Sequence, residues 1–466
     1  QVLRAPDAPA VTCEGFTLTY RELDGRANQI ANCLTDNGVV PGSRVGLCLD
    51  RSIDTIVSIL GVLKAGGAFV PMDPMNPPER LKLIVEDAQC PLIIAHMAQR
   101  GRFDGVTGTR VLVLDSIDDE LAPYGMTAET LTSHGDDVAY VMYTSGSTGK
   151  PKGVPITHAN VARMFTSTNH WFNITEADTF ALFHSYAFDL SVWEYCGALL
   201  YGGRVVVVPS LVSRSPEDFY QLLVDEKVTM LCQTPSAFRQ LQYFEDSQPG
   251  DTWKRLSLRC IVFCGEALSI PSLASWVERH GDEHPQLINS YGITETTIFL
   301  TYRRIFAHEV VLGTPSYIGV PFPDQPCVVL NEELKPVAVG EEGELYVGGA
   351  GNTTGYLNRP ELTAERFIPS PIEGQEGEIL YKTGDTVRLL DGDMAYIGRI
   401  DNQIQLRGFR VELGEIEAVL MAHPDIRGAV VRAREDTPGD VRLLAYYLAD
   451  EELPVASLRD YVFENL

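Results

Sequence analysis

One segment of the chain concentrates the residue types that bind phosphate. Residues 139–154, AYVMYTSGSTGKPKGV, run from an apolar strand into a stretch made almost wholly of Thr, Ser, Gly, Lys and Pro. Glycine lets backbone amides turn toward an anion, hydroxyls donate further hydrogen bonds, and Lys150 and Lys152 supply positive charge. The segment predicts a polyphosphate-binding loop, whose candidate contacts are Thr144, Ser145, Gly146, Ser147, Thr148, Gly149 and Lys150.

This loop differs from a Walker A loop. Lys150 is followed by Pro151, where a Walker A loop has the Ser or Thr that binds magnesium, and Thr144 stands where its first glycine would be. A flexible linker is the alternative interpretation. A linker, however, need not follow a buried strand or hold hydrogen-bond donors at this density.

Composition and charge narrow the class of protein. The 466 residues predict two or three domains or subdomains, and 45% hydrophobic residues are typical of a globular protein. A net charge of -26 argues against nucleic acid as a general partner. The nine scattered cysteines show no C-x-x-C pair, which favours reduced, buried thiols in a cytoplasmic protein and makes a zinc site improbable. The longest apolar stretch, residues 55–72, is interrupted by Lys64, so no membrane span is expected.

Hydrophobic runs alternate with helical patterns along most of the chain. Helices are expected at residues 52–66, 77–88 and 215–226, between strands at residues 43–50, 91–97, 110–114, 139–144, 204–209, 228–233 and 258–265. Such alternation predicts parallel sheets covered by helices. After about Pro315 the pattern becomes strand–turn–strand, and a third unit begins near Asp401, with strands around a helix.

Nine ordered sequence blocks together resemble the adenylate-forming superfamily, which contains peptide synthetase adenylation domains, acyl- and aryl-CoA ligases, and luciferases. The phosphate loop is one block. The others are LTYREL, LKAGGAFVPMDP, FDLSVWE, NSYGITETT, GELYVGG, GYLNRPELTAERF, YKTGD and GRIDNQIQLRGFRVELGEIE. They extend over nearly the whole chain, and the chain is most similar to the adenylation domain of a nonribosomal peptide synthetase.

The resemblance and the strand pattern together imply an α/β fold. Residues 1–400 are expected to form a large core, with two parallel-sheet α/β subdomains and a small β-rich subdomain at about 315–400. Residues 401–466 are expected to begin a mobile α+β C-terminal lobe, with Asp401 as its hinge. The family's catalytic lysine lies in a block beyond Leu466, so the chain is expected to be truncated and weakly active or inactive.

The resemblance also assigns nucleotide contacts. Tyr291 would stack on adenine, Thr294 would contact the α-phosphate, and Glu295 would hold Mg²⁺ through its carboxylate oxygen. Asp385 would accept both ribose hydroxyls, because a carboxylate can accept two such bonds at once. Thr294 and Glu295 are the candidate catalytic residues, and further nucleotide contacts are expected from Gly265, Glu266, Asn289, Gly292, Tyr396 and Arg399.

Asp189 in FDLSVWE separates subclasses of this superfamily. Peptide synthetases that take α-amino acids carry an acidic residue there, and a buried carboxylate is what a substrate ammonium needs as a partner. The remaining positions that match the family's specificity lining are uncharged, so an acidic or basic substrate side chain would lack a partner. A small or medium neutral amino acid is expected. These positions are Leu190, Trp193, Cys232, Val262, Cys264, Ser290, Ile298 and Phe299.

The implied function is activation of an amino acid with ATP and Mg²⁺, for transfer to the phosphopantetheine thiol of a carrier domain. An MbtH-like helper protein is a further partner that some members need. Three departures from the family pattern stand out: Ile293 where Pro is common, Gln405 where Lys is common, and residues 352–354, Asn-Thr-Thr, where a small residue and Arg are usual.

Two alternatives stay open at this level. An acyl- or aryl-CoA ligase of the same superfamily would show CoA-dependent product formation. A catalytically inactive binding module is compatible with the truncation and with the departures at Gln405 and residues 352–354.

Overall fold

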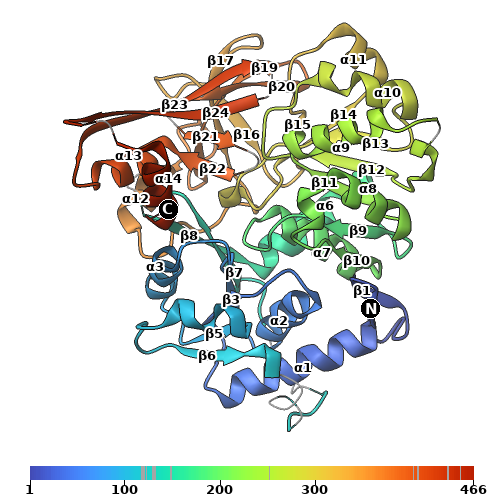
Figure 1. The fold of residues 1–466 in the computed structure, drawn as a ribbon. Coiled ribbons are helices and arrows are strands. Elements are labelled where there is room, and N and C mark those ends of the chain that lie inside the picture. The colour runs from blue at the N-terminus through green and yellow to red at the C-terminus, as the bar shows by residue number, and fades with distance from the viewer. Residues whose placement is uncertain are drawn as a thin grey trace.

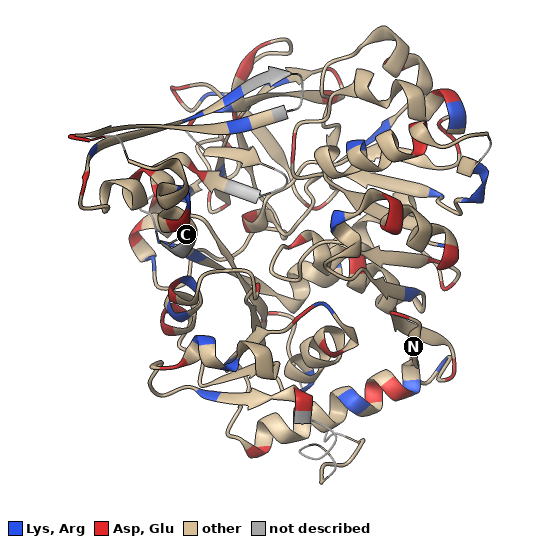
Figure 2. Cartoon of the chain, in the orientation of Figure 1, with Lys and Arg blue, Asp and Glu red and all other residues tan. Residues whose placement is uncertain are grey.

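The computed structural model describes residues 1–466 apart from 117–120, 122, 128–132, 147–149, 251, 402, 407–408, 438–439, 452 and 466. Three sheet-containing regions and a smaller C-terminal region are grouped around a central cleft (Figure 1). Acidic and basic residues are distributed through all of these regions (Figure 2).

The first region is a six-stranded sheet in the order β6-β5-β3-β4-β7-β8. Neighbours along β6 to β7 pair in parallel, and β8 is antiparallel to β7. Their runs of Val, Ile, Leu and Ala are buried because helices cover the sheet. The strands are β3 (Arg44–Cys48), β4 (Ala68–Pro71), β5 (Leu92–Ala95), β6 (Arg110–Val113), β7 (Val138–Thr144) and β8 (Lys152–Thr157), with helices α1 (Tyr20–Asp36), α2 (Ile53–Lys64), α3 (Pro78–Ala88) and α4 (Met97–Arg100).

The second region is a nine-stranded sheet in the order β15-β14-β13-β12-β11-β9-β10-β1-β2. Its central pairs, from β1 to β13, are parallel, and both edges are antiparallel. The strands are β1 (Pro9–Cys13), β2 (Phe16–Thr19), β9 (Thr179–Leu182), β10 (Arg204–Val207), β11 (Met230–Gln233), β12 (Cys260–Phe263), β13 (Gln286–Asn289), β14 (Thr301–Ile305) and β15 (Val320–Pro321). The helices are α6 (His158–Phe172), α7 (Leu190–Tyr201), α8 (Pro216–Asp225), α9 (Pro235–Ser247), α10 (Ala274–His280) and α11 (Ala307–Leu312).

The third region is an antiparallel sheet in which β20 pairs with β19 beside the path β16-β17-β19-β18. Its strands are β16 (Cys327–Leu330), β17 (Glu342–Val347), β18 (Phe367–Pro369), β19 (Ile379–Leu390) and β20 (Asp393–Arg399), and α12 (Pro360–Arg366) lies beside it. This is the β-rich unit predicted after about Pro315.

The C-terminal region combines two hairpins with two helices. Its elements are β21 (Gln403–Leu406), β22 (Phe409–Glu412), α13 (Leu413–Met421), β23 (Ile426–Thr437), β24 (Asp440–Ala449) and α14 (Val455–Asn465). It has its own apolar cluster, which includes Leu413, Leu420 and Leu458. An ion pair between Arg80 of α3 and Glu415 of α13, 3.0 Å long, joins it to the first region.

The predicted α/β class is confirmed, because the parallel strands and their covering helices occur where the apolar runs indicated. All nine cysteines are free, and most of them are buried. Within the described residues, no helix is long and apolar enough to cross a membrane. The boundaries at residues 400 and 401, the hinge and the mobility of the C-terminal lobe stay predictions.

Candidate active site

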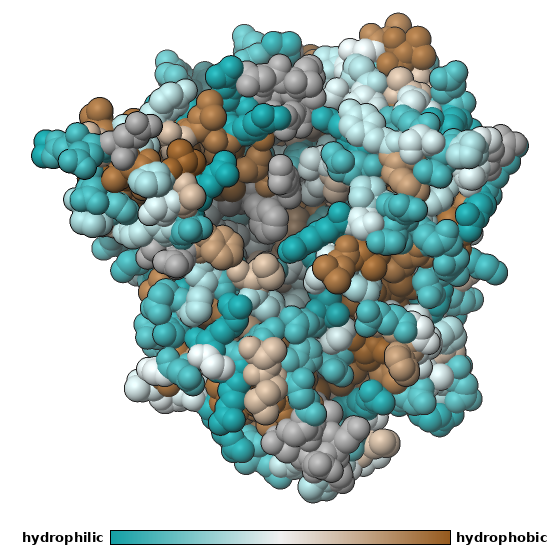
Figure 3. All heavy atoms as spheres, viewed as in Figure 1, coloured by the Kyte–Doolittle hydropathy of each residue, from teal (hydrophilic) through white to brown (hydrophobic). Residues whose placement is uncertain are grey.

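A cleft of about 1440 Å³ lies where the regions meet. Several parallel strands of the nine-stranded sheet point their carboxyl ends into it, and the residues that follow β9, β11, β12 and β13 border it. Ligands of open α/β sheets bind at this edge. Residues of β20 and β21 form the opposite wall, and the molecule is hollowed near its centre on the face shown in Figure 3.

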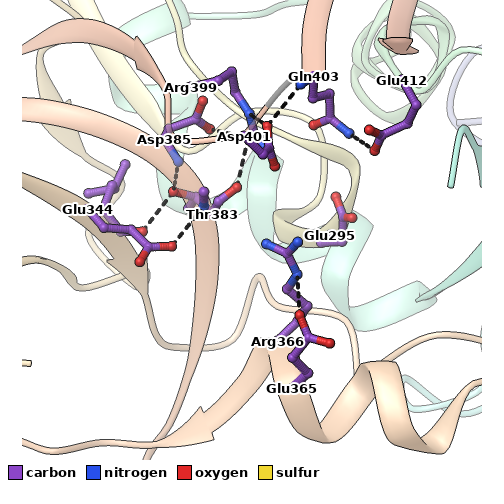
Figure 4. Close-up of polar contacts among 12 residues, drawn as sticks. Glu295, Glu344, Glu365, Arg366, Thr383, Asp385, Arg399, Asp401, Gln403 and Glu412 are labelled. Carbon is purple, nitrogen blue, oxygen red and sulfur yellow. Dashed lines mark hydrogen bonds and ion pairs between the residues drawn. The ribbon is translucent and has the colours of Figure 1, made fainter. Parts of the chain in front are cut away.

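Asp385 lies on this opposite wall beside Thr383 and Arg399 (Figure 4), and it accepts hydrogen bonds from two tyrosines. Tyr291 donates its hydroxyl to Oδ2 of Asp385 at 2.6 Å, and the Tyr396 hydroxyl lies 3.3 Å from Oδ1. Burial, followed by the Asp385 charge, raises the pKa of both tyrosines, so they remain protonated donors at neutral pH. The structure therefore brings together three of the predicted nucleotide residues, from β19, β20 and the turn after β13.

Arg399 joins the predicted ribose site to the predicted hinge. Its guanidinium lies 3.2 Å from Asp385, pairs with Asp401 at 2.6 Å and donates to the Thr383 carbonyl at 2.8 Å. Burial alone would raise the pKa of Asp401, but hydrogen bonding and charge from Arg399 outweigh it and lower that pKa. One cation thus holds two carboxylates, one on each side of the predicted boundary.

The predicted phosphate loop connects β7 to β8. An added Cβ at Gly146 would lie 2.1 Å from the Lys150 carbonyl oxygen, so only glycine fits there without movement. The Thr144 hydroxyl is buried without a hydrogen-bond partner among the described residues. Ser145 is also buried, whereas Lys150 is exposed. The predicted contacts Ser147, Thr148 and Gly149 lie outside the described residues.

Lys152 begins β8, directly after this loop. Its ammonium group is buried, 3.1 Å from Oε1 of Glu295 and 3.2 Å from the Tyr356 hydroxyl, which itself donates to Oε1 of Glu295 at 2.8 Å. The structure thus places the Lys152 charge beside Glu295, and its contribution to the loop stays a prediction. The Glu295 carboxylate is an oxygen donor of the kind that Mg²⁺ prefers, so its chemistry fits a magnesium ligand, although Oε1 is bonded to Lys152 and Tyr356 here.

The turn after β13, which carries Thr294 and Glu295, contains strained backbone. Thr297 and Ile298 both have φ in the left-handed region, +64° and +69°, which is costly for β-branched residues. An added Cβ at Gly292 would lie 2.0 Å from the Ile298 carbonyl oxygen, so the turn also needs this glycine. Strain of this kind is typical of functional sites, because the surrounding fold must hold it.

Side-chain hydrogen bonds also fix residues at or just after the carboxyl ends of β12 and β13. Asn289 donates to the Tyr317 carbonyl at 2.7 Å, and Ser290 donates to the Thr301 carbonyl at 2.5 Å. Glu266 borders the cleft and accepts from the backbone and hydroxyl of Ser236, each at 2.9 Å. Gly265 borders the cleft too. The predicted nucleotide residues Gly265, Glu266 and Asn289 therefore lie together on one wall of the cleft.

Asp189 lies directly before α7 and is 4% exposed. Burial raises the pKa of its carboxyl from 3.8 to about 6; a hydrogen bond from the Thr294 side chain opposes this effect, and the charge of Glu295 adds to it. No ion pair to Asp189 occurs among the described residues. The site therefore holds a buried acid whose ionised form lacks a salt-bridge partner.

The predicted specificity lining packs behind the cleft. Ser290 borders the open space, while the other positions are almost fully buried. The Trp193 ring lies 5.5 Å from that of Phe299 and 5.3 Å from that of Phe180, so large aromatic groups fill the volume beside Asp189. The buried positions are Leu190, Trp193, Cys232, Val262, Cys264, Ile298 and Phe299.

Residues 1–357 match the family described as "AMP-binding enzyme". The chain belongs to this family. Within it, a dimodular nonribosomal peptide synthase from Bacillus subtilis (strain 168) is 48% identical over 477 residues, which cover 100% of this chain and 20% of that protein. The chain thus spans about a fifth of that relative's length.

Two solved structures of nonribosomal peptide synthetases have the same fold. The artificially fused adenylation–PCP di-domain NpsA-ThdA from Klebsiella oxytoca has a TM-score of 0.86 and 27% identity, over 100% of this chain and 89% of that chain. FmoA3 in its α-methyl-L-serine-AMP bound form has a TM-score of 0.78 and 31% identity, over 86% of this chain and 44% of that chain. This AMP-binding family member is therefore of the nonribosomal peptide synthetase adenylation type.

One departure from the family pattern has a structural role in this AMP-binding enzyme. Thr353 is buried, its backbone N–H donates to the Glu295 carbonyl at 2.9 Å, and its hydroxyl donates to the Pro155 carbonyl. Asn352 donates to the Val347 carbonyl at 2.8 Å. The Asn-Thr-Thr segment thus ties the backbone of Glu295 to β8 and β17. Gln405 borders the cleft from β21.

Sequence reasoning missed a buried pair close to Asp189. His184 follows β9, and its Nδ1 lies 2.7 Å from Oε1 of Glu194 on α7. The side chains are 6% and 0% exposed, and Cys232 offers a thiol within 4.8 Å of both. The available signal was Glu194 itself, because an acidic residue within the apolar run LSVWEYCGALLY needs a buried partner.

Asp189→Asn is expected to stabilise the fold at neutral pH. The folded carboxyl keeps its proton up to about pH 6, whereas the unfolded one releases it near pH 3.8, so ionisation costs up to about 3 kcal/mol above pH 6. Urea unfolding at pH 7 should show a gain approaching that size. The gain should shrink as the pH falls toward 4, and an effect that is independent of pH would contradict the raised pKa.

Asp385→Asn is expected to weaken AMP binding. The substitution removes the charge that accepts from Tyr291 and would accept from ribose hydroxyls, and hydrogen bonds to charged groups are worth about 1.5–3 kcal/mol, roughly a tenfold to hundredfold change in affinity. Calorimetric titration with AMP measures this change in affinity. Asp391→Asn, in the exposed turn between β19 and β20, is the matched control, and equal affinity in both variants would remove Asp385 from the ribose site.

Proposed function

We propose that this chain activates a small or medium neutral α-amino acid as its aminoacyl-AMP, with release of pyrophosphate. The observation that carries the proposal is the buried Asp189, which has no ion-pair partner among the described residues and lies near a cleft whose opposite wall holds the Asp385 cluster. A positively charged amino group would supply the partner that the carboxylate lacks. Acyl and aryl acids without an amino group would leave it unpaired.

The cleft has room for ATP between its two walls. Asp385 would accept the ribose hydroxyls, Tyr291 would lie against adenine, and the turn from β7 to β8 would hold the phosphates through its hydroxyl and backbone donors. The Thr144 hydroxyl, which is buried without a partner among the residues that the structure describes, supports this placement, since a phosphate oxygen would satisfy it.

The reaction itself consists of two displacements. The substrate carboxylate oxygen attacks the α-phosphorus, the bond from that phosphorus to the bridging oxygen breaks, and pyrophosphate leaves. Thr294 would hold the α-phosphate, and the chain would contribute chiefly positioning and charge stabilisation. Mg²⁺, with Glu295 as its protein ligand, would neutralise phosphate charge when it is bound.

The second displacement would pass the acyl group to a carrier domain. The phosphopantetheine sulfur attacks the acyl carbon, a thioester forms and AMP leaves. The fusion of an adenylation unit with a PCP in a structural neighbour supports such a partner, and an MbtH-like helper is a further proposed partner. The cytoplasm is the proposed compartment.

The packing around Asp189 supports a neutral substrate of limited size. Trp193 and Phe299 are buried and in contact, and apart from Asp189 the predicted specificity lining holds no charged side chain. A charged substrate side chain would therefore be buried without a partner. FmoA3 was solved with α-methyl-L-serine-AMP, an adenylate of a small amino acid.

Amino-acid-dependent ATP–pyrophosphate exchange tests the function. The full-length protein, co-expressed with an MbtH-like helper, should give a strong signal with one neutral amino acid of a broad panel. CoA-dependent thioester formation from a carboxylic acid without an amino group would instead support the CoA-ligase alternative. Silence across the panel in a folded protein that binds ATP would support a binding module.

Asp189→Ala should abolish the amino-acid-dependent signal and leave ATP affinity unchanged, because the carboxylate faces the substrate ammonium and not the nucleotide. Ser191→Ala is the matched control, since Ser191 is fully buried on the same helix and its hydroxyl has no hydrogen-bond partner among the described residues. Wild-type turnover in the Asp189→Ala protein would remove the ammonium role.

A further inference from the structure

The segment between β9 and α7 is tied at both ends to buried groups. It comprises residues 183–189 and ends at Asp189. Glu194, one turn into α7, reaches back to the start of the segment. Its Oε2 accepts from the His184 backbone N–H at 3.1 Å, and its Oε1 lies 2.7 Å from Nδ1 of His184. The carboxylate therefore binds the same residue twice.

The middle of the segment is fixed to the six-stranded sheet. The Tyr186 hydroxyl donates to the Met72 carbonyl at 2.9 Å and accepts from the Leu49 N–H at 2.7 Å. Ser185 donates to Asp73 at 2.6 Å. These contacts hold the loop from one side, and the contacts with Glu194 hold it from the other.

The Glu194 contacts matter because the carboxylate is completely buried. Its side chain is 0% exposed and that of His184 is 6% exposed, so the hydrogen bonds are shielded from water. Loss of these hydrogen bonds would leave the buried carboxylate unsatisfied, at a large cost in folding free energy. The geometry of the pair is therefore rigid. The loop ends in Asp189, so the position of that carboxyl depends on where Glu194 holds His184.

We propose that the His184–Glu194 pair is a positioning device for substrate ammonium recognition, in which the fully buried Glu194 acts through His184, at the border of the cleft, to fix Asp189. This inference rests on the proposed function. Cys232, which adjoins the pair, belongs to the predicted specificity lining, so the pair directly adjoins the pocket.

Two matched ligands isolate ammonium recognition. Alanyl sulfamoyl adenosine and propanoyl sulfamoyl adenosine differ by the α-amino group alone, so the ratio of their affinities for one protein reports what the amino group contributes. Isothermal titration of the full-length protein gives both affinities. Wild type should prefer the alanyl compound, and Glu194→Gln should reduce that preference about tenfold or more, since it loses a hydrogen bond to a charged group. Affinity for the propanoyl compound should not change.

Two further variants separate positioning from general stability. His184→Asn keeps an N–H donor near the position of Nδ1 and should retain most of the preference, whereas His184→Leu should lose it. Glu245→Gln is the matched control, because Glu245 forms a second buried pair, 3.0 Å from Nε2 of His280, away from Asp189. It should lower the stability toward urea and leave the ligand preference intact.

The outcomes are distinguishable. A Glu194→Gln protein that keeps the wild-type preference, or that loses affinity for both ligands alike, overturns the positioning role. A wild-type protein that binds the two ligands equally contradicts ammonium recognition itself, and with it both the proposed function and this inference.

Discussion

A buried carboxylate, for which the described part of the chain offers no salt bridge, is the constraint on which the site depends. Asp189 is 4% exposed, and burial raises its pKa to about 6, so at neutral pH the fold keeps an ionised group where a neutral one would be more stable. A protein keeps such a destabilising group where its function requires it. The anchored loop, the strained turn at Thr297 and Ile298, and the aromatic packing around Trp193 all hold the surroundings of this one group in place.

The sheets explain why the two halves of the site can meet. Parallel strands end at one edge of the nine-stranded sheet, and there Ser290 and Tyr291 border the cleft, while Asp189 is buried directly after the bordering residue Phe188. The long strand β19 and its partner β20 bring Asp385 and Arg399 to the other side of the cleft. Arg399 bonds to Asp385 and Asp401 at once, so the proposed ribose site and the start of the C-terminal region share one cation. A substitution of Arg399 would therefore affect both the proposed ribose site and the start of the C-terminal region.

Periodicity predicted the strands and helices well because buried parallel strands are continuous apolar runs. It could not place side chains that meet across the fold. Tyr291 and Asp385 are 94 residues apart, and only the family resemblance joined them before the structure did. Nor could the sequence show that Lys152, which is expected to supply charge to the phosphate loop, pairs with Glu295, 143 residues away. The pair of His184 and Glu194 was missed because an acidic residue in an apolar run indicates a buried partner but does not show which residue that partner is.

The pH dependence of ligand affinity tests the role of Asp189 most directly. Affinities of the full-length protein for alanyl and propanoyl sulfamoyl adenosine would be measured between pH 5 and pH 8. Below about pH 6 the free carboxyl is protonated, and the alanyl ligand must displace that proton, so its affinity should fall by about tenfold per pH unit while that of the propanoyl ligand stays level. Parallel profiles for the two ligands would contradict recognition of the ammonium group by Asp189.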